Sequence, residues 1–69
     1  MKIVLNGEPR QVSDGITVAR LVREVDRDRD NGRGLAVAVD AEVVPRSEWD
    51  GLELSEGQRV ELLGAIQGG

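Results

Sequence analysis

The segment ITVARLVREV, residues 16–25, decides the fold because it carries the clear helical pattern of the chain. Thr17 is a favourable N-cap residue. Ile16 and Leu21 flank this cap at the spacing of a hydrophobic staple. Because valines are β-branched, we expect packing on a sheet to hold a helix from residue 18 to residue 25 or 26. The apolar positions recur at i, i+3, i+4 and i+7 and form one helix face: Val18, Leu21, Val22 and Val25.

Two strands are predicted before this helix. Residues 1–6 alternate between two faces, and the Asn6-Gly7 pair that follows is a strong signal for a two-residue hairpin turn. Residues 8–12 form the expected return strand. Pro9 has no backbone N–H to donate, so this second strand should lie at an edge of the sheet.

Three more strands are predicted after the helix. Residues 35–39 alternate larger apolar residues with alanines, residues 42–44 return after a tight connection, and residues 59–63 form the last strand. A short helical turn is expected at residues 46–49. Trp49, the only aromatic residue, is predicted to plug the core, with a role as a partner anchor as the alternative.

The order of these elements is strand, strand, helix, strand, strand, short helical turn, strand. One helix covers only one face of a sheet, so the fold class is α+β. A hairpin, a helical crossover and a last strand in the middle of the sheet form the β-grasp arrangement. In it, the first and last strands are parallel central neighbours in a mixed sheet of about five strands. We assign residues 1–63 to this single domain and residues 64–69 to a flexible C-terminal tail.

The helix-facing side of the sheet supplies the predicted core: Ile3, Leu5, Val18, Leu21, Val22, Val25, Val37, Val39, Leu52, Leu54, Val60 and Leu62. The opposite face presents a smaller apolar set: Val4, Ala36, Ala38 and Leu63. These four residues are either ordinary surface or the centre of a docking patch.

Composition limits the classes of function. The 69 residues include no cysteine and no histidine. This excludes disulfides, thiolate nucleophiles, zinc sites of the usual kind and the commonest general base. Lys+Arg number 9 and Asp+Glu 13, for a net charge of −4, which suits a basic groove on a protein partner and not a nucleic acid. No apolar run is long enough for a signal peptide or a membrane span, so we expect a cytoplasmic protein.

A charged segment with two glycines, residues 26–34, follows the helix. Asp26, Asp28 and Asp30 are spaced like the start of a calcium loop, but interleaved arginines neutralise these carboxylates. The glutamate that closes such a loop is missing, because position 37 is Val37. We therefore expect a solvated surface loop and no metal site.

The chain ends in LLGAIQGG, residues 62–69. Gly68 and Gly69 have no Cβ, so the backbone can pass through a narrow channel and approach another molecule closely. The Gly69 carboxylate is unhindered and ionised at neutral pH. Such a carboxylate can attack ATP and form an acyl adenylate, which a sulfur or nitrogen nucleophile can displace. A terminus without function is the alternative.

Several stretches together match a known pattern, most specifically VVPRSEW at residues 43–49 combined with AIQGG at residues 65–69. Through them the chain resembles the ThiS family, the ubiquitin-like sulfur carriers of thiazole (thiamine) biosynthesis, over nearly its whole length. The charged segment 26–34 departs from the pattern, because it is longer than a minimal version of the fold needs. The other matching stretches are the Asn6-Gly7 hairpin, residues 17–21 and residues 60–62.

The resemblance implies that the chain is a protein cosubstrate and not an enzyme. An ATP-dependent activating enzyme, similar to ubiquitin-activating enzymes, would adenylate Gly69. A sulfur-donating enzyme would then give a thiocarboxylate, and thiazole synthase would consume its sulfur. The carrier would bind no cofactor, since the activating partner uses the ATP, and it would be a monomer when free. The tail residues Ile66, Gln67 and Gly68 would lead to the modified end.

Three other functions remain open. The small subunit of molybdopterin synthase shares the fold, the tail and the thiocarboxylate, although this chain is short for that relative. A ubiquitin-like protein modifier would end in an isopeptide bond, and Lys2, the only lysine, nearly excludes chains linked through the protein's own lysines. The third alternative is a plain interaction module with an idle tail.

Partner enzymes are expected to bind the open face of the sheet at Val4, Ala38 and Leu63 and to direct the tail into their active site. The six residues from Gly64 to Gly69 reach roughly 20 Å when extended, enough to enter an active site below a partner's surface. Ile66 would contact the partner along this path or fold back on its own domain.

Overall fold

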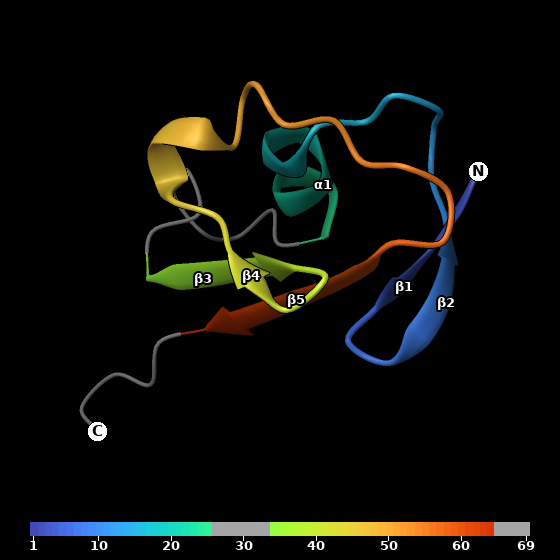
Figure 1. Cartoon of the computed structure of the whole chain (residues 1–69), viewed down its shortest axis with the longest axis horizontal. Coiled ribbons are helices and arrows are strands. Elements are labelled where there is room, and N and C mark those ends of the chain that lie inside the picture. Colours follow the sequence, from blue (N-terminus) through green and yellow to red (C-terminus); the bar gives the residue numbers. More distant parts are fainter. Residues whose placement is uncertain (26–33, 65–69) are drawn as a thin grey trace.

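The structure is a computed structural model that describes residues 1–25 and 34–64 of the chain. Residues 26–33 of the charged segment and residues 65–69 of the tail therefore lie outside the described residues. The described elements form a mixed sheet with a helix on one face (Figure 1). In chain order they are β1 (Lys2–Leu5), β2 (Glu8–Gln11), α1 (Val18–Val25), β3 (Leu35–Val39), β4 (Glu42–Val43), the 3-10 helix η2 (Arg46–Glu48) and β5 (Arg59–Gly64).

The five strands are arranged in the order β2-β1-β5-β3-β4. β1 and β5 pair in parallel, whereas β1–β2, β3–β5 and β3–β4 are antiparallel pairs. The first and last strands are thus central neighbours, and β2, which contains Pro9, is an edge strand. These features confirm the predicted β-grasp arrangement.

Two-residue turns close both hairpins. Asn6 and Gly7 have φ values of 49° and 84°, and Asp40 and Ala41 have values of 50° and 69°. Two consecutive positive φ angles are characteristic of the type I′ turn, whose twist matches that of the flanking strands. The first turn has the predicted Asn-Gly sequence, but the second places an alanine where glycine is preferred.

The start of α1 is fixed from two sides. The Arg20 backbone N–H donates to the Thr17 hydroxyl oxygen over 3.2 Å, which confirms Thr17 as the N-cap. The Val18 N–H, the first of the helix, donates to the Leu52 carbonyl over 2.9 Å. The helix therefore has a fixed entry, and one face of it is buried: Val18, Leu21 and Val22.

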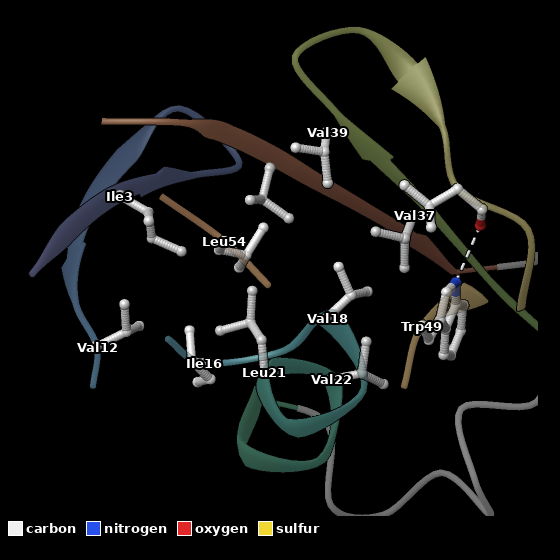
Figure 2. Close-up of a cluster of buried hydrophobic side chains, with 12 residues drawn as sticks. Ile3, Val12, Ile16, Val18, Leu21, Val22, Val37, Val39, Trp49 and Leu54 are labelled. Atoms are coloured by element: carbon white, nitrogen blue, oxygen red, sulfur yellow. Dashed lines mark hydrogen bonds between the residues drawn. The ribbon is translucent and has the colours of Figure 1, made fainter. Parts of the chain in front are cut away.

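The core lies between α1 and the sheet, and Figure 2 shows its side chains. Val25 was predicted in this core but is 38% exposed, because it is the last residue of α1 and lies beyond the buried helix residues Val18, Leu21 and Val22. Three other predicted core residues, Leu5, Leu52 and Leu62, are partly buried and pack against the cluster. Val12, Val44 and the predicted plug Trp49 join the core, as does Ile16 of the staple. The remaining predicted residues are confirmed: Ile3, Val18, Leu21, Val22, Val37, Val39, Leu54 and Val60.

Candidate functional site

The strand β5 joins the core of the fold to the C-terminal tail. It runs between β1 and β3, and its register with β3 extends from Val60 opposite Val39 to Gly64 opposite Leu35. Gly64 is thus the last residue of β5, one position beyond the predicted strand. Since side chains alternate along a strand, the residues next to core-facing Val60 and Leu62 project on the open face away from α1: Arg59, Glu61 and Leu63.

A shallow groove lies on this open face beside the end of β5. Its volume is ≈520 Å³. The residues that line the groove come from β5, β3, β4 and the β1–β2 turn: Asn6, Ala36, Val37, Ala38, Val43, Glu61, Leu62 and Leu63. Predicted docking residues Ala38 and Leu63 therefore belong to one surface, which we call the groove face.

The strand register explains why the groove face is apolar. Ala36 lies opposite Leu63, and Ala38 lies opposite Glu61 on one side and Val43 on the other. Leu63 is 73% exposed and Val43 is 77% exposed, so two large apolar side chains border the floor made by the two alanines. A pair of exposed apolar residues beside a shallow apolar floor is typical of a binding surface.

Val43 is the apolar side chain of this surface that was not predicted from the sequence; Asn6 and Glu61 of the groove lining were not predicted there either. The tight turn at Asp40 and Ala41 pairs Val39 with Glu42, and it therefore pairs Ala38 with Val43. Counting outward from a two-residue turn would have placed Val43 on the same face as Ala38, since paired residues share a face.

Val4, the third predicted docking residue, is on the same side of the sheet but does not line the groove. It pairs with Pro9 of β2 and with Arg59 of β5, and it is partly buried. Because Arg59 and Glu61 are successive outward residues of β5, they separate Val4 from Leu63 along the strand. The structure thus brings Ala38 and Leu63 together and leaves Val4 toward the β1–β2 edge.

The site contains little charge and no recognisable set of metal ligands in the described residues. Glu61 is the acidic residue among the groove-lining side chains, in a chain with a net charge of −4. Within the two described ranges, no group of three or more potential metal ligands is arranged to hold an ion, and no helix there is both long and apolar enough to span a membrane. The calcium-like spacing of Asp26, Asp28 and Asp30 lies outside these ranges.

The predicted tail residues lie beyond the end of β5. Ile66, Gln67, Gly68 and Gly69 are outside the described part of the chain, so their predicted roles stay predictions. The structure does place the residue before them, since Gly64 is the last residue of the central strand β5 and directly follows Leu63 of the groove face.

The order of the strands and the position of α1 on one face of the sheet define the class of this protein as ubiquitin-like β-grasp. The model of the ThiS family matches residues 3–69, which is nearly the whole chain. The chain therefore belongs to the ThiS family.

Two relatives and one solved structure agree with this assignment. The chain is 30% identical to the sulfur carrier protein ThiS of Escherichia coli K12 over 69 residues, with all of both chains covered. It is 36% identical over 69 residues to a thiazole synthase of Paramagnetospirillum magneticum, but it spans only 20% of that protein's length. The crystal structure of the thiamine biosynthesis protein ThiS of Geobacter metallireducens superposes with a TM-score of 0.84 at 25% identity and full coverage of both chains.

Proposed function

We propose that this sulfur carrier of thiamine biosynthesis holds its sulfur on the C-terminal carboxylate of Gly69. An ATP-dependent activating enzyme adenylates the carboxylate, a sulfur-donating enzyme converts the adenylate to a thiocarboxylate, and thiazole synthase uses that sulfur to form the thiazole. The observation that carries the proposal is that the central strand β5 is followed, in sequence, by five residues that end in Gly68-Gly69 in a chain of the ThiS family.

The chemistry needs little from the carrier beyond its terminus. A carboxylate oxygen of Gly69 attacks the α-phosphorus of ATP, and pyrophosphate leaves with the electron pair of the broken P–O bond. A sulfur nucleophile at the oxidation level of sulfide then adds to the acyl carbon, and AMP leaves. The chain contains no cysteine, so a thiocarboxylate lets it carry sulfur without a side-chain thiol. In this scheme the carrier is a cosubstrate that binds no cofactor, and ATP is held by the activating partner.

The groove face supports an encounter with these partners. Leu63 and Val43 expose apolar surface on the groove face, and Leu63 directly precedes Gly64, the last residue of β5. Contact there would direct the tail toward the partner's active site. Val4 would extend the contact toward β1. The similarity of the whole chain to a segment of a thiazole synthase supports that enzyme as one partner. We place the reaction in the cytoplasm, where ATP is available.

The proposal is tested by the mass and the thiol reactivity of the protein purified from its own cells. Replacement of one oxygen by one sulfur, followed by a single alkylation with iodoacetamide at neutral pH, is the expected result. The absence of cysteine makes this reaction specific, because no side-chain thiol competes. A matched chain that lacks Gly69 should show neither change. If cells that make thiamine yield only the unmodified mass, or a mass joined to another protein through an isopeptide bond, the carrier proposal is wrong.

A further inference from the structure

We propose that the outer edge of β5 at Leu62 and Gly64 is a strand-pairing site, to which the enzyme that activates the tail adds an extended backbone segment. The inference rests on the proposed function for the identity of the partner. It starts from the lengths of the neighbouring strands, because β1 ends at Leu5 whereas β5 continues to Gly64. Figure 1 shows β5 running on past the β1–β2 turn.

The direction of each backbone group along β5 follows from hydrogen bonds at its start. The Asp40 N–H donates to the Arg59 carbonyl over 2.8 Å, so the backbone N–H and C=O groups of Arg59 point toward β3. The Asn6 N–H donates to the Val60 carbonyl over 2.9 Å, so the backbone N–H and C=O groups of Val60 point toward β1. Because this direction alternates along a strand, the N–H and C=O groups of Leu62 and Gly64 also point to the β1 side.

Asn6 closes part of this edge. It follows the last residue of β1 and turns away with a φ of 49°. Its side-chain Oδ1 accepts a hydrogen bond of 2.9 Å from the Leu62 N–H, and thereby replaces the backbone acceptor that a longer β1 would supply. Beyond this point, no hydrogen bond to the Leu62 C=O or from the Gly64 N–H is found among residues 1–25 and 34–64. Within these two ranges, the Leu62 C=O and the Gly64 N–H are therefore available for pairing.

The remaining pattern fits a strand that continues the line of β1. In a parallel pair, one residue of the added strand donates its N–H to the C=O of one residue and accepts from the N–H two residues further on. The Leu62 C=O and the Gly64 N–H have this relationship. An antiparallel strand paired with Leu62 would need both the C=O and the N–H of Leu62, and this N–H already donates to the Asn6 side chain. The geometry thus favours a parallel segment.

The length of the tail indicates which protein supplies the added strand. The five residues from Ala65 to Gly69 span at most roughly 17 Å. An enzyme that binds this tail in a channel leading to its active site therefore comes close to the end of β5, and its surface lies against the edge at Gly64. An added strand there is also adjacent to Leu63 of the groove face, so backbone pairing and apolar contact act on the same partner.

The test compares Gly64→Pro with Gly64→Ala. Proline removes the N–H and fits an edge position, and in the described residues that N–H has no partner to lose, so both variants should melt with the intact chain. Gly64→Ala keeps the N–H and serves as the comparison. In ATP–pyrophosphate exchange with the activating enzyme of the same organism, we expect the KM for Gly64→Pro to exceed that for Gly64→Ala about tenfold, with a smaller change in kcat.

A second measurement does not depend on any variant. In the complex with the same enzyme, exchange of the Gly64 amide hydrogen with solvent should slow at least about tenfold relative to the free carrier. Equal KM values for the two variants, or an amide hydrogen exchange rate that the enzyme leaves unchanged, would overturn the strand-pairing site. In that case ATP–pyrophosphate exchange with the intact chain would still uphold the proposed function. If the intact chain itself supports no exchange, the proposed function fails and this inference fails with it.

Discussion

The indole Nε1–H of Trp49 donates a 2.9 Å hydrogen bond to the backbone carbonyl of Val44, and both residues are buried (Figure 2). The Val44 N–H in turn donates to the Val37 carbonyl over 2.8 Å. Trp49 therefore fixes the segment that follows β4 against β3. The Arg46 guanidinium carbon lies 5.7 Å from the centre of the Trp49 ring, which adds a cation–π contact at the surface side of η2.

We predict that Trp49→Phe lowers the free energy of unfolding by about 1–3 kcal/mol, because the buried Val44 carbonyl loses its indole donor while most of the aromatic volume is kept. Urea denaturation followed by far-ultraviolet circular dichroism measures this, since the variant has no tryptophan fluorescence. The spectrum of the native variant serves as the control for an intact fold. A variant that unfolds at the same urea concentration as the original chain would contradict the importance of this bond.

Leu21→Ala should lower the free energy of unfolding by roughly 2–5 kcal/mol, because Leu21 is completely buried and the change leaves a cavity. Val25→Ala on the same helix is the matched control, and its effect should be much smaller because Val25 is 38% exposed. Chemical denaturation of the two variants side by side checks the difference. Equal losses would show that the buried face of α1 is misassigned.

Ala41→Gly should stabilise the fold by about 1 kcal/mol, because Ala41 has a φ of 69° and glycine adopts this conformation without steric cost. The change converts the second hairpin turn to Asp-Gly, the preferred type I′ sequence. Ala19→Gly in α1 is the control and should destabilise by about 1 kcal/mol, since glycine is unfavourable inside a helix. A lower melting temperature for Ala41→Gly would contradict the argument from backbone strain.

Much of the fold could be predicted because local patterns determine it. The helix cap at Thr17, the Asn6-Gly7 turn and the edge position of Pro9 each follow from the chemistry of one or two residues. The burial of Val12 and the exposure of Val25 could not be predicted in this way. Val12 directly follows β2 and Val25 is the last residue of α1, and at such boundaries burial depends on neighbouring segments and not on periodicity.

The site was predictable in part for a similar reason. Alternation along a strand placed Ala38 and Leu63 on the open face, but it does not reveal which residues of that face are neighbours. Strand register decides this. It pairs Val43 with Ala38, and it pairs Val4 with Arg59, which is separated from Leu63 by Glu61 on the outward side of β5. The hydrogen bond from Leu62 to Asn6 also depends on register, because 56 positions separate the two residues.

Changes on the open face should weaken partner binding without unfolding the domain. Leu63→Asp places a carboxylate on an exposed apolar position that the partner would bury, so the dissociation constant for the activating enzyme should rise about tenfold or more. Val4→Asp should also weaken the complex if the contact extends to β1. Ser47→Asp makes the same change in charge on η2, away from the groove, and is the control. Titration calorimetry that finds unchanged affinity for both face variants would exclude this face.

Deletion of Gly69 should abolish adenylation, because the reaction needs a free carboxylate at a fixed reach. The shortened chain still ends in a glycine, but its carboxylate retreats by one residue, roughly 3.5 Å. In-line attack on the α-phosphate of ATP needs reacting atoms about 3–3.5 Å apart, so this shift removes the productive geometry.

Gly68→Val and Gly69→Val test the channel and not the reach. Each keeps the full length of the tail and adds a branched side chain where the partner's channel would have to admit one, so both should also lose adenylation. The three changes lie outside the core residues of the described domain, and a melting curve of each variant should match that of the intact chain. ATP–pyrophosphate exchange with the activating enzyme measures the reaction. Exchange by the Gly69 deletion at the rate of the intact chain would mean that the tail is not the reactive end, and the thiocarboxylate would then have no carboxylate on which to form.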